Sequence, residues 1–209
     1  MASDLRVGVV VGTFGDPSWH DLALRRAIRS VEHQTRPPDD WRLVHAGSLA
    51  EARNRGAEQL KADLIVFLDA DDQLDAGYLA AMEAAYEPRT LLQPQTLGVY
   101  PNGTEDPEPC FIAPARSIME RNHLVIGTAI ERDLLLEVGG FLERPILEDW
   151  CLWIRCLIKG AAQKQVPDAV YRVHVEPDSR NVRSHKTMVD TYRKIRARYL
   201  QPAKDVGLA

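Results

Sequence analysis

The chain has 209 residues, of which 45% are hydrophobic and 27% are charged, and its formal net charge is −4. This length and apolar content suffice for one sizeable core, so we expect a single domain over residues 1–209. The balance of charge lacks the basic excess that is typical of nucleic-acid binders. Three cysteines (Cys110, Cys151 and Cys156) have no disulfide-framework or zinc-site spacing.

The N-terminal apolar run is too short for a secretory signal and is better interpreted as a first strand. No apolar stretch approaches the roughly 18 residues of a membrane span. These features predict a cytoplasmic protein, with peripheral membrane contact as an open alternative.

Strands and helices alternate along the first 86 residues. Apolar runs of strand length cover 5–11, 41–45 and 62–68, and helical patterns cover 19–34, 49–61 and 75–86. This order predicts an α/β fold with a doubly wound, mostly parallel sheet and right-handed crossovers. Ligands of such sheets bind at the carboxyl ends of the strands.

Residues that commonly cap helix N-termini support these predicted helices. Ser18 with Asp21, and Ser48 with Glu51, have the spacing of a capping box. Asp72 or Asp75 is expected to cap the third helix.

The second half has a less regular pattern. Strands are predicted over 90–100, 110–119 and 165–175, and helices over 131–138, 147–159 and 184–201. Gly139-Gly140 and Gly160 are expected to end the first two of these helices.

The stretch LIVFLDADD (64–72) places three carboxylates at the end of a buried strand. Carboxylates this close repel each other, and a divalent cation with a preference for oxygen ligands, Mg²⁺ or Mn²⁺, offsets that cost. Haloacid-type phosphatases and response-regulator receivers also place aspartates after strands, but theirs follow the first strand. Here the first strand is followed by GTFGD (12–16), which has one aspartate.

Three segments in this order resemble family 2 glycosyltransferases of the GT-A fold. They are SLAEARNRGAEQLKADLIVFLDADDQLDAGYLAAM (48–82), GTAIERDLLLEVGGFLERPILEDWCLWIRCLIKGA (127–161) and YRVHVEPDSR (171–180). The resemblance implies a Rossmann-like single domain with a nucleotide-sugar-binding half (1–95), an acceptor half (96–183) and a basic C-terminal helix (184–209). It also implies a metal-dependent, inverting transfer of a sugar from a nucleotide-diphosphate donor to an acceptor hydroxyl.

The resemblance assigns roles on the donor side. Asp69 would bind the ribose, Asp71 a metal that bridges the diphosphate, and His174 would be a second metal or diphosphate contact. A guanidinium pairs well with phosphate or a base edge, so Arg53 is expected to contact the donor. The full donor-side prediction comprises Thr13, Phe14, Asp16, Arg53, Asp69, Ala70 and Asp71.

On the acceptor side, the resemblance makes Asp149 the general base. Inverting transfer needs one carboxylate that takes the proton of the acceptor hydroxyl as that oxygen attacks. Glu148 and Trp150 are expected beside the acceptor, whereas Trp153 fits a core face. Favourable charge at a helix N-terminus would also explain an acidic residue here.

The chain departs from the family at VHAGS (44–48). Many members have Val-Asp-Asp-Gly-Ser there, with an aspartate that reads uracil, but His45 and Ala46 replace both acids. The donor nucleotide is therefore not fixed by the resemblance. An inert GT-A-like binding module and a metal-dependent nucleotidyltransferase are the alternative functions.

The acceptor is open among glycan, lipid, protein and modified nucleobase. The tail helix is basic, with Lys186, Arg193, Lys194, Arg196 and Arg198. A solvated face, a lid, a contact with an anionic membrane and a homodimer contact all fit this composition.

Overall fold

The computed structural model describes residues 4–107, 113–143, 146–175 and 185–209, with only the backbone described over 185–187. Cys110, part of the predicted strand 110–119 and the side chain of Lys186 lie outside this part of the chain.

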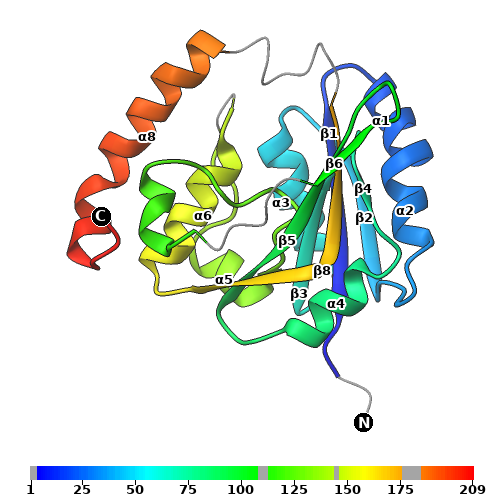
Figure 1. The fold of residues 1–209 in the computed structure, drawn as a ribbon, viewed down its shortest axis with the longest axis horizontal. Helices are drawn as coiled ribbons and strands as arrows, with labels where there is room; N and C mark the ends of the chain where they lie inside the picture. The colour runs from blue at the N-terminus through cyan, green and yellow to red at the C-terminus, as the bar shows by residue number, and fades with distance from the viewer. Residues whose placement is uncertain (1–3, 108–112, 144–145, 176–184) are drawn as a thin grey trace.

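The first sheet is built mostly from the first half of the chain (Figure 1). Its strands are β1 (Val7–Phe14), β2 (Asp40–Ala46), β3 (Leu64–Asp69) and β7 (Ile130–Glu131). The order is β2-β1-β3-β7, with the first three parallel and β7 antiparallel to β3. The predicted α/β class and parallel arrangement are confirmed. All residues of β1 except Phe14 are buried, as expected for a strand with both faces covered.

A second sheet was not expected. It contains β4 (Gln73–Leu74), β5 (Thr90–Val99), β6 (Glu105–Pro107) and β8 (Ala162–His174), in the order β4-β8-β5-β6. Only β5 and β8 are parallel; β4 and β6 are antiparallel to their neighbours. The short turn between β5 and β6 makes a hairpin, with Gly103 at φ +79°. A pattern read along the chain cannot show that β8 pairs with both β4 and β5.

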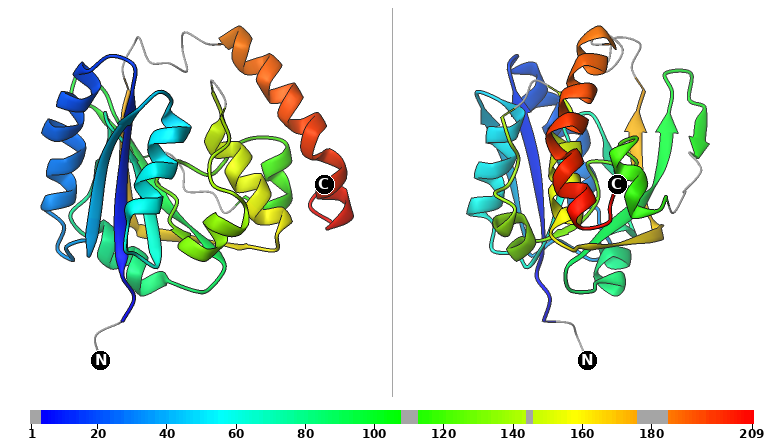
Figure 2. Two further views of the ribbon diagram at one scale, coloured as in Figure 1. Left: turned by 180° about the vertical axis from the view of Figure 1, so that it is seen from behind. Right: turned by 90° about the vertical axis from the view of Figure 1, so that its left-hand side faces the viewer.

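Helices cover both faces of the first sheet. The helices and helical turns of the described residues are α1 (Ser18–Ala23), the π-helical turn η1 (Leu24–Ile28), α2 (Arg29–Glu32), α3 (Leu49–Gln59), α4 (Tyr78–Ala85), the 3₁₀ turn η2 (Ala115–Met119), α5 (Arg132–Glu137), α6 (Glu148–Ile158) and α8 (His185–Asp205). α1, η1 and α2 follow one another without a break on one face, and α3 packs on the other (Figures 1 and 2). α8 lies on the outer side of α6 (Figure 2).

The capping box at the start of α3 is confirmed. The Glu51 N–H donates to Ser48 Oγ at 3.1 Å, and the Glu51 carboxylate accepts the Gly47 N–H at 3.0 Å. These bonds satisfy donors that the first turn of a helix leaves unpaired.

Two other start signals are wrong. Ser18 is the first residue of α1, and its N–H donates to Asp16 at 2.8 Å. α4 follows Gly77 without a side-chain cap, because Asp72 and Asp75 bind side chains of β8 instead. The predicted strand over 110–119 is also wrong where it is described, since residues 115–119 form a 3₁₀ turn.

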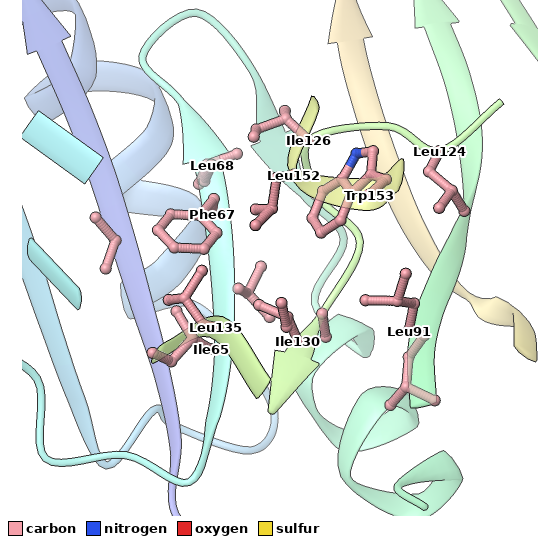
Figure 3. Packing of buried hydrophobic residues seen from close by; sticks show 14 of the residues in the cluster. Ile65, Phe67, Leu68, Leu91, Leu124, Ile126, Ile130, Leu135, Leu152 and Trp153 are labelled. Atoms are coloured by element: carbon pink, nitrogen blue, oxygen red, sulfur yellow. The ribbon is translucent and has the colours of Figure 1, made fainter. Parts of the chain in front are cut away.

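The core lies between β3, β5, α5 and α6 (Figure 3). Phe67 of β3 meets Phe141 edge-on, with ring centroids 4.8 Å apart. Trp153 is fully buried, which confirms its predicted place in the core. Cys151 and Cys156 are buried too, and burial raises the pKa of the Cys156 thiol to about 12.

Candidate functional site

The acids of the donor side lie at the carboxyl end of β3. Asp69 ends this strand opposite Gly12 of β1, and residues 70–72 turn the chain into β4. Asp69 keeps 30% of its side chain exposed, whereas Ala70 is buried and Asp71 is half-buried. The site therefore occupies the edge where an α/β sheet binds its ligands.

The loop after β1 has mixed accessibility. Thr13 is only 2% exposed, and its Oγ lies 3.0 Å from Nδ1 of His45 at the end of β2. Phe14 is 37% exposed beside it. Asp16 accepts the Ser18 N–H, and this bond lowers the pKa of its carboxyl. The structure thus assigns Asp16 a role at the start of α1, and its predicted donor contact stays a prediction.

Asp72 fastens β8 to the acidic turn. One carboxylate oxygen accepts the Tyr171 hydroxyl at 3.0 Å, and the other accepts the His174 N–H at 2.9 Å. The Tyr171 oxygen in turn accepts the Asp69 N–H at 3.2 Å. Burial raises the pKa of Asp72 well above its usual value, and the charges of Asp69 and Asp71 raise it further.

His174 is brought beside this turn, as the sequence predicted. Its ring Nε2 lies 2.8 Å from the side-chain amide oxygen, Oε1, of Gln73. Because that oxygen only accepts, Nε2 carries the proton in this contact, and the bond orients the ring.

A metal ion at this turn would need ligands from the substrate as well as from the protein. No group of three His, Cys, Asp or Glu residues is placed to hold an ion anywhere in the described ranges. Mg²⁺ commonly uses one or two carboxylates together with substrate phosphates and water. The predicted metal at Asp71 and His174 stays a prediction, which the negative charges of Asp69 and Asp71 beside Asp72 would favour.

Arg53 of α3 lies between the two acidic motifs. Its Nη2 is 2.6 Å from Asp69 Oδ1, and its Nη1 is 2.9 Å from Glu148 Oε1. The side chain is 2% exposed, and the guanidinium lies 5.1 Å from the centroid of the Phe141 ring. The predicted contact of Arg53 with the donor stays a prediction, because two protein carboxylates engage the guanidinium here.

Asn54 of α3 holds the segment that leads to α6. Its amide nitrogen donates to the Phe141 carbonyl at 2.8 Å, and its oxygen accepts the Phe141 N–H at 2.8 Å. Gly140 has φ +64°, and a Cβ there would lie 2.5 Å from the Asn54 oxygen. The Asn54 amide and the Gly139-Gly140-Phe141 motif therefore form one contact.

Asp149 lies in the first turn of α6, where the sequence placed a base. Its Oδ2 accepts the side-chain N–H of Asn122 at 2.8 Å. Partial burial and the neighbouring Glu148 charge raise the pKa of Asp149 to about 6, against the effect of Arg53 and of the bonds from Trp150 N–H and Asn122. Asn122 was missed because it belongs to no motif; its position depends on the fold around η2.

Trp150 does not line an open acceptor site, which corrects the prediction. It is fully buried, its indole N–H donates to the Ile118 carbonyl at 2.7 Å, and its ring stacks on Tyr192 of α8 at 4.5 Å. It anchors the tail helix to α6. An apolar cavity of about 500 Å³ runs along α8, with Arg193 and Arg196 in its lining.

No helix within the described ranges is long and apolar enough to cross a bilayer. The cytoplasmic location and the peripheral membrane contact stay predictions.

This arrangement defines an α/β protein of the GT-A type, with acids gathered at the end of β3 and at the start of α6. Residues 41–124 match the model of glycosyl transferase family 2. The match covers less than half of the chain and agrees with the family resemblance that the sequence motifs indicated. The Gly-Gly-Phe motif, Glu148-Asp149 and His174 lie beyond the matched segment. Among curated proteins the chain has no match.

Solved structures of similar fold include the crystal structure of S. aureus TarS. That comparison has a TM-score of 0.65 and 16% identity, and covers 83% of this chain and 37% of that one. S. aureus TarS 1-349 in complex with UDP gives a TM-score of 0.63 at 16% identity, covering 83% and 61%. The complex with UDP-GlcNAc gives 0.62 at 15% identity, covering 84% and 60%. The chain thus spans less than two thirds of these proteins, and the likeness shows a shared fold.

Proposed function

We propose that the chain is a metal-dependent, inverting glycosyltransferase that moves a sugar from a nucleotide-diphosphate donor to an acceptor hydroxyl. One observation carries the proposal: the acids at the end of β3 and those at the start of α6 meet at a single buried arginine. The family 2 match supports the reaction class. The TarS complexes with UDP and UDP-GlcNAc support a nucleotide-sugar donor.

The donor side needs groups for the ribose and the diphosphate. Asp69 is partly exposed while Arg53 holds one of its oxygens, so the carboxylate keeps a fixed orientation as it accepts from a ribose hydroxyl. Asp71 and His174 would hold Mg²⁺ or Mn²⁺, which supplies positive charge to the departing diphosphate. With that charge present, no protein acid is required at the leaving group.

The acceptor side needs one base. Asp149 takes the proton from the acceptor hydroxyl as that oxygen bonds to the anomeric carbon from the face opposite the diphosphate, and the bond to the diphosphate oxygen breaks. A pKa of about 6 keeps this carboxylate mainly ionised at neutral pH and still basic enough to accept the proton. Asn122 orients it, since its amide occupies one oxygen.

The donor base is the least determined part of the proposal. His45 is exposed at the end of β2 and contacts the buried Thr13. Ala46 offers no group to a base edge. We therefore extend the proposal to nucleotide-diphosphate sugars as a class and leave the base to experiment.

The test is thermal stabilisation by UDP-, GDP-, dTDP-, CDP- and ADP-linked sugars, each with and without Mn²⁺. A specific ligand raises the melting temperature by mass action. Stabilisation by one nucleotide only with metal, followed by release of the nucleoside diphosphate, would support sugar transfer. Release of pyrophosphate would indicate a nucleotidyltransferase instead. Absence of stabilisation by every donor would favour the inert binding module.

A further inference from the structure

Arg53 is buried between the two acidic motifs and forms an ion pair with each of them. We propose that Arg53 is a positioning residue for the transfer reaction, because its guanidinium holds the donor-side Asp69 and the acceptor-side Glu148 in one fixed arrangement around the reacting groups. This inference rests on the proposed function. It assigns Arg53 to the geometry between the two substrates and not to direct contact with either.

The contact geometry supports this role. The two ion pairs use different nitrogens of one planar group, and they reach residues 16 and 95 positions away in the chain. Arg53 and Glu148 are both almost completely excluded from water. A rigid fork can hold two carboxylates at a set angle, whereas a lysine ammonium acts as a point charge.

The surroundings leave the Arg53 side chain little freedom. Its Cγ would lie 3.2 Å from a Cβ at Gly12, so β1 packs directly against its stem. α3 approaches β1 closely, since a Cβ at Gly56 would lie 2.4 Å from Val10. The Phe141 ring lies 5.1 Å from the guanidinium on the acceptor side. The adjacent Asn54 binds the backbone of the same Phe141. One turn of α3 therefore positions both the guanidinium and the aromatic ring beside it.

The charges around Asp149 predict the direction in which its pKa shifts when Arg53 or Glu148 is replaced. Glu148 raises the pKa of Asp149 after burial, whereas Arg53 from α3 lowers it. The other groups that face this carboxylate are the neutral Asn122 amide and the Trp150 N–H. Removal of Arg53 should therefore raise the pKa of Asp149, and removal of the Glu148 charge should lower it. A residue that only filled space would give neither shift.

The experiment compares Arg53→Met, Arg53→Lys, Glu148→Gln and the double variant Arg53→Met/Glu148→Gln in the full chain. Two readouts are used. One is the titration of the Asp149 carboxyl by NMR of protein with ¹³C-labelled aspartate, assigned with Asp149→Asn. The other is the pH dependence of nucleoside-diphosphate release, with Mn²⁺, from whichever of the UDP-, GDP-, dTDP-, CDP- and ADP-linked sugars stabilises the protein, with water or an acceptor taking the sugar. Urea unfolding of each variant reports whether it is folded.

We expect the Asp149 midpoint to move to higher pH in Arg53→Met and to lower pH in Glu148→Gln. In Arg53→Lys and in the double variant it should stay near the wild-type midpoint, since the local charge balance is kept. Arg53→Lys should nevertheless lose about a hundredfold in kcat, because one ammonium cannot hold both carboxylates in position.

Unchanged Asp149 midpoints in folded Arg53→Met and Glu148→Gln would overturn the inference, as would wild-type kcat in Arg53→Lys. If Arg53→Met does not fold, Glu148→Gln and the double variant decide, because they leave no uncompensated buried carboxylate at position 148. If the Asp149 midpoint shifts in opposite directions in Arg53→Met and Glu148→Gln but the protein turns over no donor, the contacts of Arg53 with both motifs are upheld and the proposed function is overturned. The two hypotheses therefore fail separately.

Discussion

Substitution of Gly140 by alanine tests how α3 holds the acceptor-side segment. Gly140 has φ +64°, and an added Cβ would lie 2.5 Å from the side-chain oxygen of Asn54. Gly139 provides a matched control, because it has φ +77° and its added Cβ would meet nothing within 4 Å. Both variants impose a left-handed backbone on alanine, but only Gly140→Ala displaces Asn54.

The expected magnitudes follow from this difference. A left-handed alanine costs about 1–2 kcal/mol, and lower entropy of the unfolded chain returns roughly 0.4–1 kcal/mol. Gly139→Ala should therefore destabilise by about 1 kcal/mol. Gly140→Ala also loses the two bonds between Asn54 and the Phe141 backbone, each worth ~1 kcal/mol or more when a buried partner is left unpaired. Its total should be about 3 kcal/mol.

The assay is urea unfolding, followed by tryptophan fluorescence, of the two glycine variants, of Asn54→Ala and of Asn54→Ala/Gly140→Ala. With m of about 2 kcal/mol/M, Gly140→Ala should unfold roughly 1 M urea earlier than Gly139→Ala. In the Asn54→Ala background this extra cost should vanish, as a non-additive pair requires. Equal midpoints for Gly139→Ala and Gly140→Ala, or full additivity with Asn54→Ala, would refute the reasoning.

Three further predictions concern the chemistry. Because the pKa of Asp149 is about 6 and only its ionised form is a base, kcat/KM should fall about tenfold from pH 7 to pH 5, while Asp149→Asn should be about a thousandfold slower and lack this limb. A steady-state pH profile checks this, and an acid limb near pH 4 would contradict it. Asp71→Ala should abolish the Mn²⁺-dependent part of nucleotide affinity in calorimetry; unchanged affinity would remove the metal assignment. Ala46→Asp should raise affinity for UDP relative to other diphosphates, and equal affinities would show that this position does not face the base.

The sequence predicted the first half of the fold because its signals are local. The valine-rich β1 and the Ser48–Glu51 capping box each depend on residues within one element. The second sheet depends on pairing between distant segments. β5 pairs with β8, and Gln73 lies opposite Arg172, so no single window of sequence contains the contact. Predicted helix caps were wrong where the acid binds a distant partner instead, as Asp72 binds Tyr171.

The same distinction explains the candidate site. Asp69, Asp71 and Asp149 were predicted from the sequence because they belong to recognisable motifs. Asn122 and Tyr171 were missed because a lone amide or a strand tyrosine has no local pattern; their roles arise from contacts to residues 27 and 99–102 positions away. Trp150 was misassigned for a related reason, since its partner Tyr192 belongs to a helix that the motif does not include.

The two acidic motifs have opposite electrostatic requirements, and the bridge between them reconciles these. Burial raises the pKa of Asp72, and the charges of Asp69 and Asp71 raise it further; these neighbouring negative charges would favour a cation at the turn. Asp149 needs a raised pKa to act as a base, yet it must remain ionised at neutral pH. A positive charge placed between Asp69 and Glu148 limits repulsion between the motifs while Glu148 keeps the pKa of Asp149 raised. A neutral residue at position 53 would leave these carboxylates without the charge that offsets their repulsion, and for that reason we expect the pKa of Asp149 to rise in Arg53→Met.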